Sequence, residues 1–298
     1  MIKKILIALI ISVEHFLNNL GGSVGKYYTR MVLVIFSFFL FASSSYAISP
    51  VMLHGMSGGS ASGLGYLEDA NCAGAWYMNA DGSTGETDRC VGGSEDLAVS
   101  ASDTIPTASP VTAYSGASRD FENGDADFLY HADGGTTDIS GAEQGLSVCG
   151  WFSLESSGVT QYLVSKIALG GQTQYSLLFD TGSLGLVFTI SNDGSAYNFA
   201  AGSVDVSSGW HHSCGVYDPV GNEILLYVDG GEDDTTAHTT GIFNGNGLFI
   251  IGESGFGQGT YGFDGLLDEI IVFDRVLTPL EVLDIYTNGV DGSKGAND

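Results

Sequence analysis

Residues 209–218 read GWHHSCGVYD and residues 223–230 read EILLYVDG, and these two stretches decide the fold. In the first, aromatic, cysteine and aliphatic residues fall on alternate positions, as in a β-strand whose two faces differ. The second is apolar and ends in Asp229-Gly230, a pair typical of a tight hairpin turn. Together they predict two strands of an antiparallel sheet.

The same pattern of short apolar runs extends over most of the chain. Short apolar runs separated by Gly, Asn and Asp predict strands at 74–79, 127–131, 146–154, 162–166, 175–180, 184–190, 210–218, 223–229, 248–252 and 266–273. Residues 94–118, rich in Ser, Thr and Ala, are expected to form a long surface connection. Thr278-Pro279-Leu280-Glu281 predicts the start of one helix, and Gly289 its end. The expected fold is all-β, a two-sheet antiparallel sandwich with one short C-terminal helix.

Charge and composition exclude several function classes. The 298 residues include 9 Lys and Arg against 35 Asp and Glu, which gives a formal net charge of −26. Such a surface cannot bind nucleic acid by neutralising phosphates, and it would be repelled by an anionic membrane. Hydrophobic residues make up 44% of the chain, enough to build a core.

The N-terminal region resembles an export signal. The apolar run 31–42 follows Lys26 and Arg30 and ends at Ser45-Tyr46-Ala47, a site of the kind that signal peptidase accepts. We therefore expect a leader over 1–47, a secreted mature chain starting at Ile48 and no stable membrane span in that mature chain. The true start, Met1 or Met31, stays open. Residues 48–70 are expected to be a flexible Gly/Ser-rich segment, 71–290 one domain and 291–298 a tail.

All four cysteines lie after the predicted cleavage site, and they are Cys72, Cys90, Cys149 and Cys214. An even number in an exported chain favours disulfides over free thiols. Four cysteines allow three pairings, which spacing alone leaves open. No C-x-x-C spacing occurs, so a zinc site is not expected.

Four stretches in order resemble a known family. They are 146–152 (LSVCGWF), 209–218, 223–230 and 261–284 (YGFDGLLDEIIVFDRVLTPLEVLD). They are similar to the laminin-G-like, pentraxin-like domains of the concanavalin A-like lectin/glucanase superfamily, over about residues 71–288. The resemblance implies a jelly-roll sandwich. Pentraxins carry one cysteine in each of the two strands that hold Cys149 and Cys214, bonded together, which implies this pair and leaves Cys72 with Cys90. If the faces of the two strands that carry Cys149 and Cys214 both point into the sandwich, the bond lies beside Trp151 and Trp210.

Enzyme signatures are weak. Glucanases of this type of fold place acids at alternating positions of one strand, but Ile270 and Val272 separate Asp268 from Asp274. His211 and His212 are adjacent in a strand, so they face opposite ways and cannot chelate one ion. The motif at 257–262 (GQGTYG) leads into a strand instead of a helix, which excludes a dinucleotide site.

Calcium is the one cofactor that the sequence suggests. Asp88 and Asp268, with Asp81 and Glu269 nearby in the sequence, flank the first and last strands, which this fold type brings together. We therefore expect a structural Ca²⁺ at Asp88 and Asp268, the alternative being solvated turn acids. The acidic calcium loop of pentraxins is replaced here by 253–257 (ESGFG), in which Glu253 is the one acid.

Sugars bind to aromatic platforms beside hydrogen-bonding groups. The expected ligand-binding residues, all in predicted loops, are Tyr197, Phe256, Gln258 and Tyr261, with Phe243, Asn192 and Asp193 as further candidates. The resemblance implies an exported, non-enzymatic recognition module that binds carbohydrate or another extracellular surface polymer through loops at the sandwich rim. The alternatives are a glycoside hydrolase or polysaccharide lyase on the same fold, and a structural cell-surface protein.

Overall fold

A computed structural model describes residues 65–80, 83–100, 107–108, 117–125, 127–256 and 259–290. The predicted leader, residues 48–64 of the predicted Gly/Ser-rich segment and the tail lie outside these ranges. The strands are β1 (Cys72–Trp76), β2 (Ala98–Val99), β3 (Thr107–Ala108), β4 (Ser118–Phe121), β5 (Leu129–His131), β6 (Leu146–Leu154), β7 (Gln161–Ile167), β8 (Thr173–Asp180), β9 (Gly185–Ser191), β10 (Tyr197–Ala201), β11 (Trp210–Asp218), β12 (Glu223–Val228), β13 (Gly231–Ala237), β14 (Phe249–Ile251) and β15 (Gly265–Phe273). The helix α3 spans Pro279–Asn288, and two short 3-10 helices are η2 (Tyr66–Glu68) and η3 (Asn123–Asp125).

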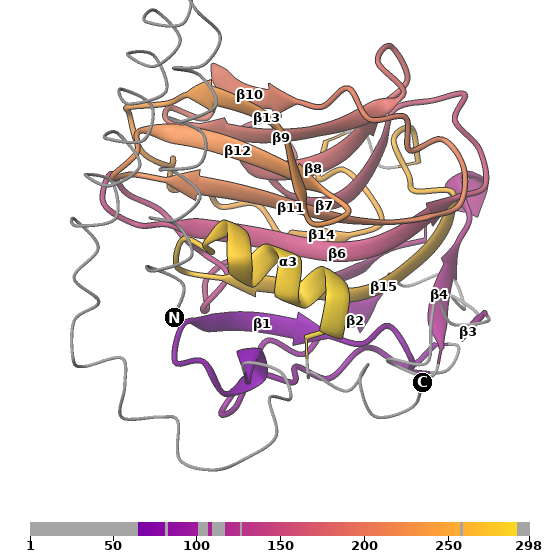
Figure 1. Cartoon of the computed structure of the whole chain (residues 1–298). Helices are drawn as coiled ribbons and strands as arrows, with labels where there is room; N and C mark the ends of the chain where they lie inside the picture. Colours follow the sequence, from indigo (N-terminus) through magenta and orange to yellow (C-terminus); the bar gives the residue numbers. More distant parts are fainter. Residues whose placement is uncertain are drawn as a thin grey trace, which may run out of the picture. The chain divides into compact units, whose positions relative to one another are not determined.

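The strands form two antiparallel sheets (Figure 1). One is eight-stranded, in the order β13-β12-β11-β6-β15-β4-β3, with β1 also paired to β15. The other is seven-stranded, in the order β10-β9-β8-β7-β14-β5-β2. One apolar cluster takes side chains from both sheets, among them Val148 and Phe152 from one and Phe179 and Phe188 from the other. The predicted all-β sandwich is confirmed.

All ten predicted strands are present in the structure, and β6 and β11 have the predicted bounds. Five further strands were not predicted: β2, β3, β4, β10 and β13. The interpretation of 94–118 as a plain connection was wrong, because β2 and β3 lie within it. The unpredicted β13 reads GEDDTTA, which lacks apolar alternation because it is an edge strand with no buried residue.

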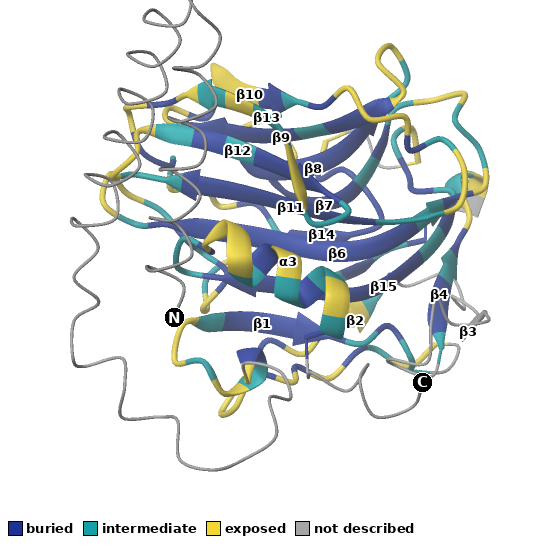
Figure 2. Ribbon diagram, viewed as in Figure 1, coloured by how far each residue is buried: buried dark blue, intermediate teal, exposed yellow. Residues whose placement is uncertain are grey.

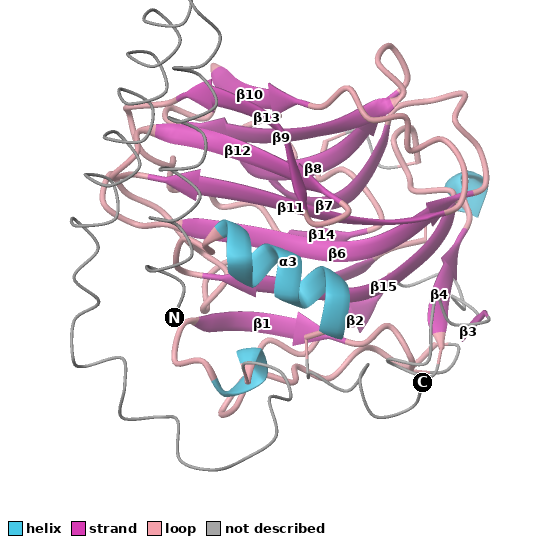
Figure 3. Cartoon of the chain, viewed as in Figure 1, coloured by secondary structure: helices cyan, strands magenta, loops and turns pink. Residues whose placement is uncertain are grey.

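Helix α3 lies on the outer face of the eight-stranded sheet (Figures 1 and 3). The Thr278 side chain accepts a hydrogen bond from the Glu281 N–H, and the Glu281 side chain accepts one from the Thr278 N–H, which completes the predicted capping box. The helix ends at Gly289, whose φ of 75° favours glycine. Val282 and Ile285 are buried toward the sheet, while the opposite side of the helix is exposed (Figure 2).

The predicted disulfide Cys149–Cys214 is confirmed, and the condition that it faces into the sandwich is not met. The two cysteines face each other across β6 and β11. They belong to an outer cluster with Val216, Tyr227 and Ile285, beneath α3 instead of between the sheets. The reason is that the next position, Gly215, faces the core, where an added Cβ would lie 2.2 Å from the Phe188 ring.

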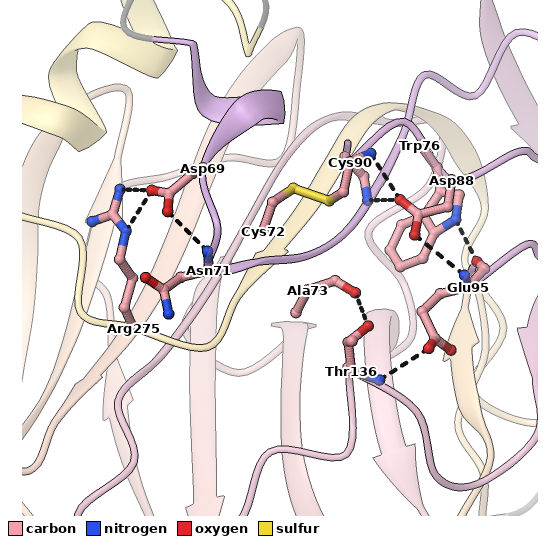
Figure 4. Close-up of a disulfide and its surroundings, with 11 residues drawn as sticks. Asp69, Asn71, Cys72, Ala73, Trp76, Asp88, Cys90, Glu95, Thr136 and Arg275 are labelled. Atoms are coloured by element: carbon pink, nitrogen blue, oxygen red, sulfur yellow. Dashed lines mark hydrogen bonds and ion pairs between the residues drawn. A yellow bond between two sulfur atoms is a disulfide. The ribbon is translucent and has the colours of Figure 1, made fainter. Parts of the chain in front are cut away.

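The second predicted disulfide, Cys72–Cys90, is also confirmed (Figure 4). It ties β1 to the segment that follows, and Asp88 reinforces this attachment. The Asp88 carboxylate accepts hydrogen bonds from the N–H groups of Ala75, Cys90 and Glu95, at 3.1, 3.0 and 3.2 Å. These bonds fasten the segment around Asp88 to β1, which in turn pairs with β15 of the eight-stranded sheet.

His212 is buried between the eight-stranded sheet and α3. Its ring lies 5.3 Å from Trp151 and 6.0 Å from Tyr286, centroid to centroid, and it is 1% exposed. Its neighbour His211 faces the other way, with Nδ1 2.8 Å from the Asp229 carboxylate, as the alternation predicted. Burial lowers the pKa of His212 to about 4, so the ring is neutral near pH 7.

Removal of either disulfide is expected to destabilise the fold, the longer loop contributing more. Cys149 and Cys214 are 65 residues apart and Cys72 and Cys90 are 18 apart. In the chain-entropy model C149A/C214A should lower the free energy of unfolding by about 4 kcal/mol and C72A/C90A by about 3 kcal/mol. Urea unfolding of both double variants measures this. Equal stability of wild type and C149A/C214A would contradict it.

His212 predicts a loss of stability in acid. The unfolded chain takes up the proton near pH 6.5 and the folded chain near pH 4, so the unfolded state holds more protons between these values. The free energy of unfolding should fall as pH falls through this window, by up to about 1.4 kcal/mol per pH unit for this one site. H212F keeps a ring between Trp151 and Tyr286 but cannot titrate, so its slope should be smaller. Identical slopes for the two proteins in urea unfolding between these pH values would refute the assignment.

Candidate ligand-binding site

The outer face of the seven-stranded sheet is built by β7, β8, β9 and β10. Along β8 and β9 the alternate residues Leu177, Phe179, Leu186 and Phe188 enter the core. The residues between them therefore point outward. Strand register aligns them in rows, one running Phe199–Thr189–Ser176 and the next Ala201–Val187–Leu178–Tyr162.

These rows line a hollow of about 390 Å³. Its size lies within the range of about 300–1,000 Å³ found for ligand pockets. The lining combines apolar side chains in its centre with hydroxyl groups around them. The lining residues are Thr160, Tyr162, Thr173, Ser176, Leu178, Asp180, Ser183, Val187, Thr189, Tyr197, Phe199 and Ala201.

Two aromatic rings stand exposed on one side of the hollow. Tyr197 is 56% exposed and Phe199 46% exposed, and their centroids lie 6.4 Å apart. Both point to the same face, because they are two residues apart in β10. Tyr197 was predicted in a loop, but it is the first residue of the unpredicted β10. Sequence reasoning missed Phe199, although the Tyr-x-Phe spacing is the signal of a one-sided aromatic strand.

A second aromatic pair joins this face, Tyr162 from β7 and Tyr261 from the loop before β15. Tyr162 and Tyr261 meet edge to face with centroids 6.0 Å apart. Burial raises the pKa of the Tyr162 hydroxyl, and the neighbouring Tyr197 and Tyr261 raise it further, so the phenol stays protonated. The structure therefore brings the predicted residues Tyr197 and Tyr261 around Tyr162, which was not predicted.

The loop that carries Tyr261 is held by a buried carboxylate. Glu253 is fully buried, and its oxygens accept hydrogen bonds from the Ser254 N–H at 2.7 Å and the Gly259 N–H at 2.6 Å. The backbone of Gly255 lies against β7, where an added Cβ would lie 1.8 Å from the Ile167 carbonyl oxygen. Glu253, the one acid in this loop segment, is therefore used to shape the loop.

The other predicted ligand residues lie elsewhere or outside the description. Phe256 is exposed, but its ring lies over the turn at Gly171. Phe243 contacts the turn at Gly194. Neither lines the hollow on β7–β10, and Gln258 lies outside the described residues. A second hollow of about 540 Å³ lies beside Ile167 and Gly255 and extends to Leu248 and Ile250.

Asp180 is the one carboxylate among the residues that line the hollow on β7–β10. It accepts hydrogen bonds from the N–H groups of Gly182 and Ser183, each at 3.1 Å, and so shapes the β8–β9 turn. Glycoside hydrolysis by the two-carboxylate mechanism needs a second acid in the same site. The lining offers none.

Three acids on another part of the fold could hold a cation. Within the described residues, Asp120, Glu122 and Glu155 have carboxylate oxygens within 4.8 Å of one another. Burial raises the pKa of Asp120 and of Glu155, and the nearby Asp264 raises both further. The predicted calcium ligands Asp88 and Asp268 do not belong to this group. Asp88 already accepts three main-chain N–H groups, and Asp268 is 1% exposed with one oxygen 2.8 Å from the Glu269 N–H.

The sequence of the chain matches one protein-family model. Residues 124–283, more than half of the chain, match the model of a laminin-G-type family described as the concanavalin A-like lectin/glucanases superfamily. No curated protein sequence matches the chain.

Three solved structures illustrate the fold. The binding domain of Paraclostridial Mosquitocidal Protein 1 is 14% identical with a TM-score of 0.57, over 73% of this chain and 52% of that one. The binding domain of Botulinum Neurotoxin DC, in complex with SialylT, is 10% identical with a TM-score of 0.53, over 73% and 51%. Domain 4 of AbnA, an extracellular arabinanase from Geobacillus stearothermophilus in complex with arabinotriose, is 18% identical with a TM-score of 0.53, over 74% and 100%. This chain thus spans about half the length of the two toxin binding domains.

The fold disfavours the charge of Glu155 and favours that of Asp193, so removing the two charges should shift the melting temperature in opposite directions. The raised pKa of Glu155 means that the folded protein disfavours its charge, so E155Q should raise the melting temperature in chelator. The N–H groups of Ala196 and Ser195 lower the pKa of Asp193, so the fold favours that charge and D193N should lower the melting temperature. Differential scanning fluorimetry at pH 7 tests both variants. Shifts of the same sign would contradict this account.

Proposed function

This chain belongs to the concanavalin A-like lectin/glucanases superfamily, and we propose that it is an exported, non-enzymatic carbohydrate-binding module that holds its glycan on the outer face of the seven-stranded sheet. The observation that carries the proposal is the hollow on β7–β10, flanked by the exposed rings of Tyr197 and Phe199. This placement differs from the rim loops expected from the sequence.

The chemistry of the hollow suits a sugar. A sugar ring presents C–H groups on its faces, which contact aromatic rings, and hydroxyl groups at its edges, which need hydrogen-bond partners. Tyr197 and Phe199 supply the rings, and Leu178 and Val187 supply an apolar centre. Hydroxyl side chains such as Ser176 surround them.

The residues that line the hollow favour binding of a glycan over its hydrolysis. The alternative, a glycoside hydrolase, would need two carboxylates flanking the bound glycosidic bond, and the lining has Asp180 alone. The fold neighbours named above support a binding role, since two of them are binding domains and the third is a domain solved with arabinotriose. Turnover would be revealed by new reducing ends in a polysaccharide panel.

Export is supported by the two disulfides, because such bonds persist in oxidising compartments. Among the described residues, the helices are too short or too polar to cross a bilayer. N-terminal sequencing of secreted protein tests the predicted cleavage after Ala47. A structural cell-surface role, the second alternative, would be favoured by self-assembly together with a blank glycan array.

The proposal predicts that loss of the exposed rings weakens glycan binding without unfolding the protein. Y197A and F199A should each weaken binding of the best array ligand by about tenfold, the loss expected for one aromatic contact of about 1.4 kcal/mol. Isothermal titration measures the affinity, and thermal unfolding should show little change because both rings are exposed.

L280A serves as the matched control, because Leu280 is 77% exposed on α3, over the other sheet. It should bind as wild type does. Binding unaffected by Y197A and F199A would show that the ligand lies elsewhere on the molecule.

Calcium is proposed as a stabilising ion, on the strength of the net charge of −26 and the acidic group at Asp120, Glu122 and Glu155. An ion that binds only the folded state adds about 2.7 kcal/mol at a hundredfold excess over Kd. Melting temperatures in millimolar calcium and in chelator, at matched ionic strength, test this. Loss of the calcium effect in E155Q would place the ion at the acidic group, and loss in D268N would place it at the site expected from the sequence. Equal melting temperatures for the wild type would contradict both.

A further inference from the structure

We propose that the hollow on β7–β10 selects uncharged glycans and rejects glycans that carry carboxylate or sulfate groups. This inference rests on the proposed function and names the class of sugar that the site takes. It follows from what the lining contains and from where the basic side chains of the described residues lie.

The lining is neutral apart from one acid. Seven of its side chains carry a hydroxyl group, and they are Thr160, Tyr162, Thr173, Ser176, Ser183, Thr189 and Tyr197. The remainder are apolar except Asp180. Hydroxyl groups both donate and accept hydrogen bonds, so they match sugar hydroxyls without offering a positive charge.

A cation strengthens the recognition of an anionic sugar, because carboxylate and sulfate groups lose strong hydration on binding. The basic side chains within the described ranges number four, and none lines the hollow. Each already has a partner. Arg119 pairs with Glu86, Lys166 with Asp133, Arg275 with Asp69 and Glu281, and the Arg89 guanidinium lies over the Tyr77 ring.

The negative charges of the protein also disfavour binding of an anionic glycan. Asp180 lies in the lining itself, and the chain carries a net charge of −26. Like charges at a binding surface slow association and weaken the complex. A neutral glycan meets no such cost, and its C–H faces can contact Tyr197, Phe199 and the apolar centre.

The test compares one oligosaccharide in its neutral form and as its sulfate ester, and uses the salt dependence to isolate the effect of charge. The best-binding neutral oligosaccharide from a glycan array is chemically sulfated, and isothermal titration measures both forms. The sulfated form should bind at least about tenfold more weakly. Raising NaCl from about 50 to about 500 mM should recover part of that loss, because salt screens repulsion, and should leave the neutral ligand unaffected.

A charge placed in the hollow provides a matched pair of variants. T160K adds a cation to the lining and should narrow the difference between the neutral and sulfated ligands. V220K adds the same charge at an 88% exposed position in the β11–β12 turn and should leave that difference unchanged. Equal effects of the two variants would show that net charge, and not the hollow, sets the preference.

The outcomes separate the two proposals. Preference for anionic glycans, weakened by Y197A, would overturn the selectivity while leaving carbohydrate binding on this face intact. Absence of binding to every glycan on the array would instead contradict the proposed function itself.

Discussion

Coverage of the outer face of the eight-stranded sheet is the constraint on which the rest of the structure depends. That face is apolar, carrying the Cys149–Cys214 disulfide and Val216, and it must be removed from water. Helix α3 and the segment before β1 cover it together. Arg275 links them, with its guanidinium 2.7 Å from Asp69 and 2.9 Å from Glu281. The Tyr66 hydroxyl adds a hydrogen bond of 2.9 Å to Asp284 of the helix.

With one outer face covered, the other sheet provides the open one. Strand β10, at its edge, has three exposed residues of five, whereas its neighbours β9 and β8 are buried almost throughout (Figure 2). The loop held by Glu253 contributes Tyr261 to this face beside Tyr162. The exposed aromatic rings therefore lie at the edge of this sheet, where β10 flanks the hollow.

The sequence predicted the sandwich, the helix with its capping box and both disulfides, because each depends on local periodicity, on local capping signals or on a family resemblance. It did not predict which face of β11 meets the core, since alternation in a strand buried on both sides has no polar side to mark the outside. It also missed β10. The residue between the exposed Tyr197 and Phe199 is exposed as well, so most of this strand lacks the buried face that would mark it as a strand. The hollow is created by the pairing of β10 with Thr189 and Val187 of β9, and a single sequence does not predict strand register.

The central claim is that a neutral glycan binds across β8, β9 and β10. Chemical-shift mapping of the ¹⁵N-labelled protein, titrated with the best-binding neutral oligosaccharide, tests it most directly. The account predicts that the largest amide shifts fall on these three strands and around Tyr162 and Tyr261. Shifts concentrated around α3, or confined to the turns at the ends of the sandwich, would contradict it.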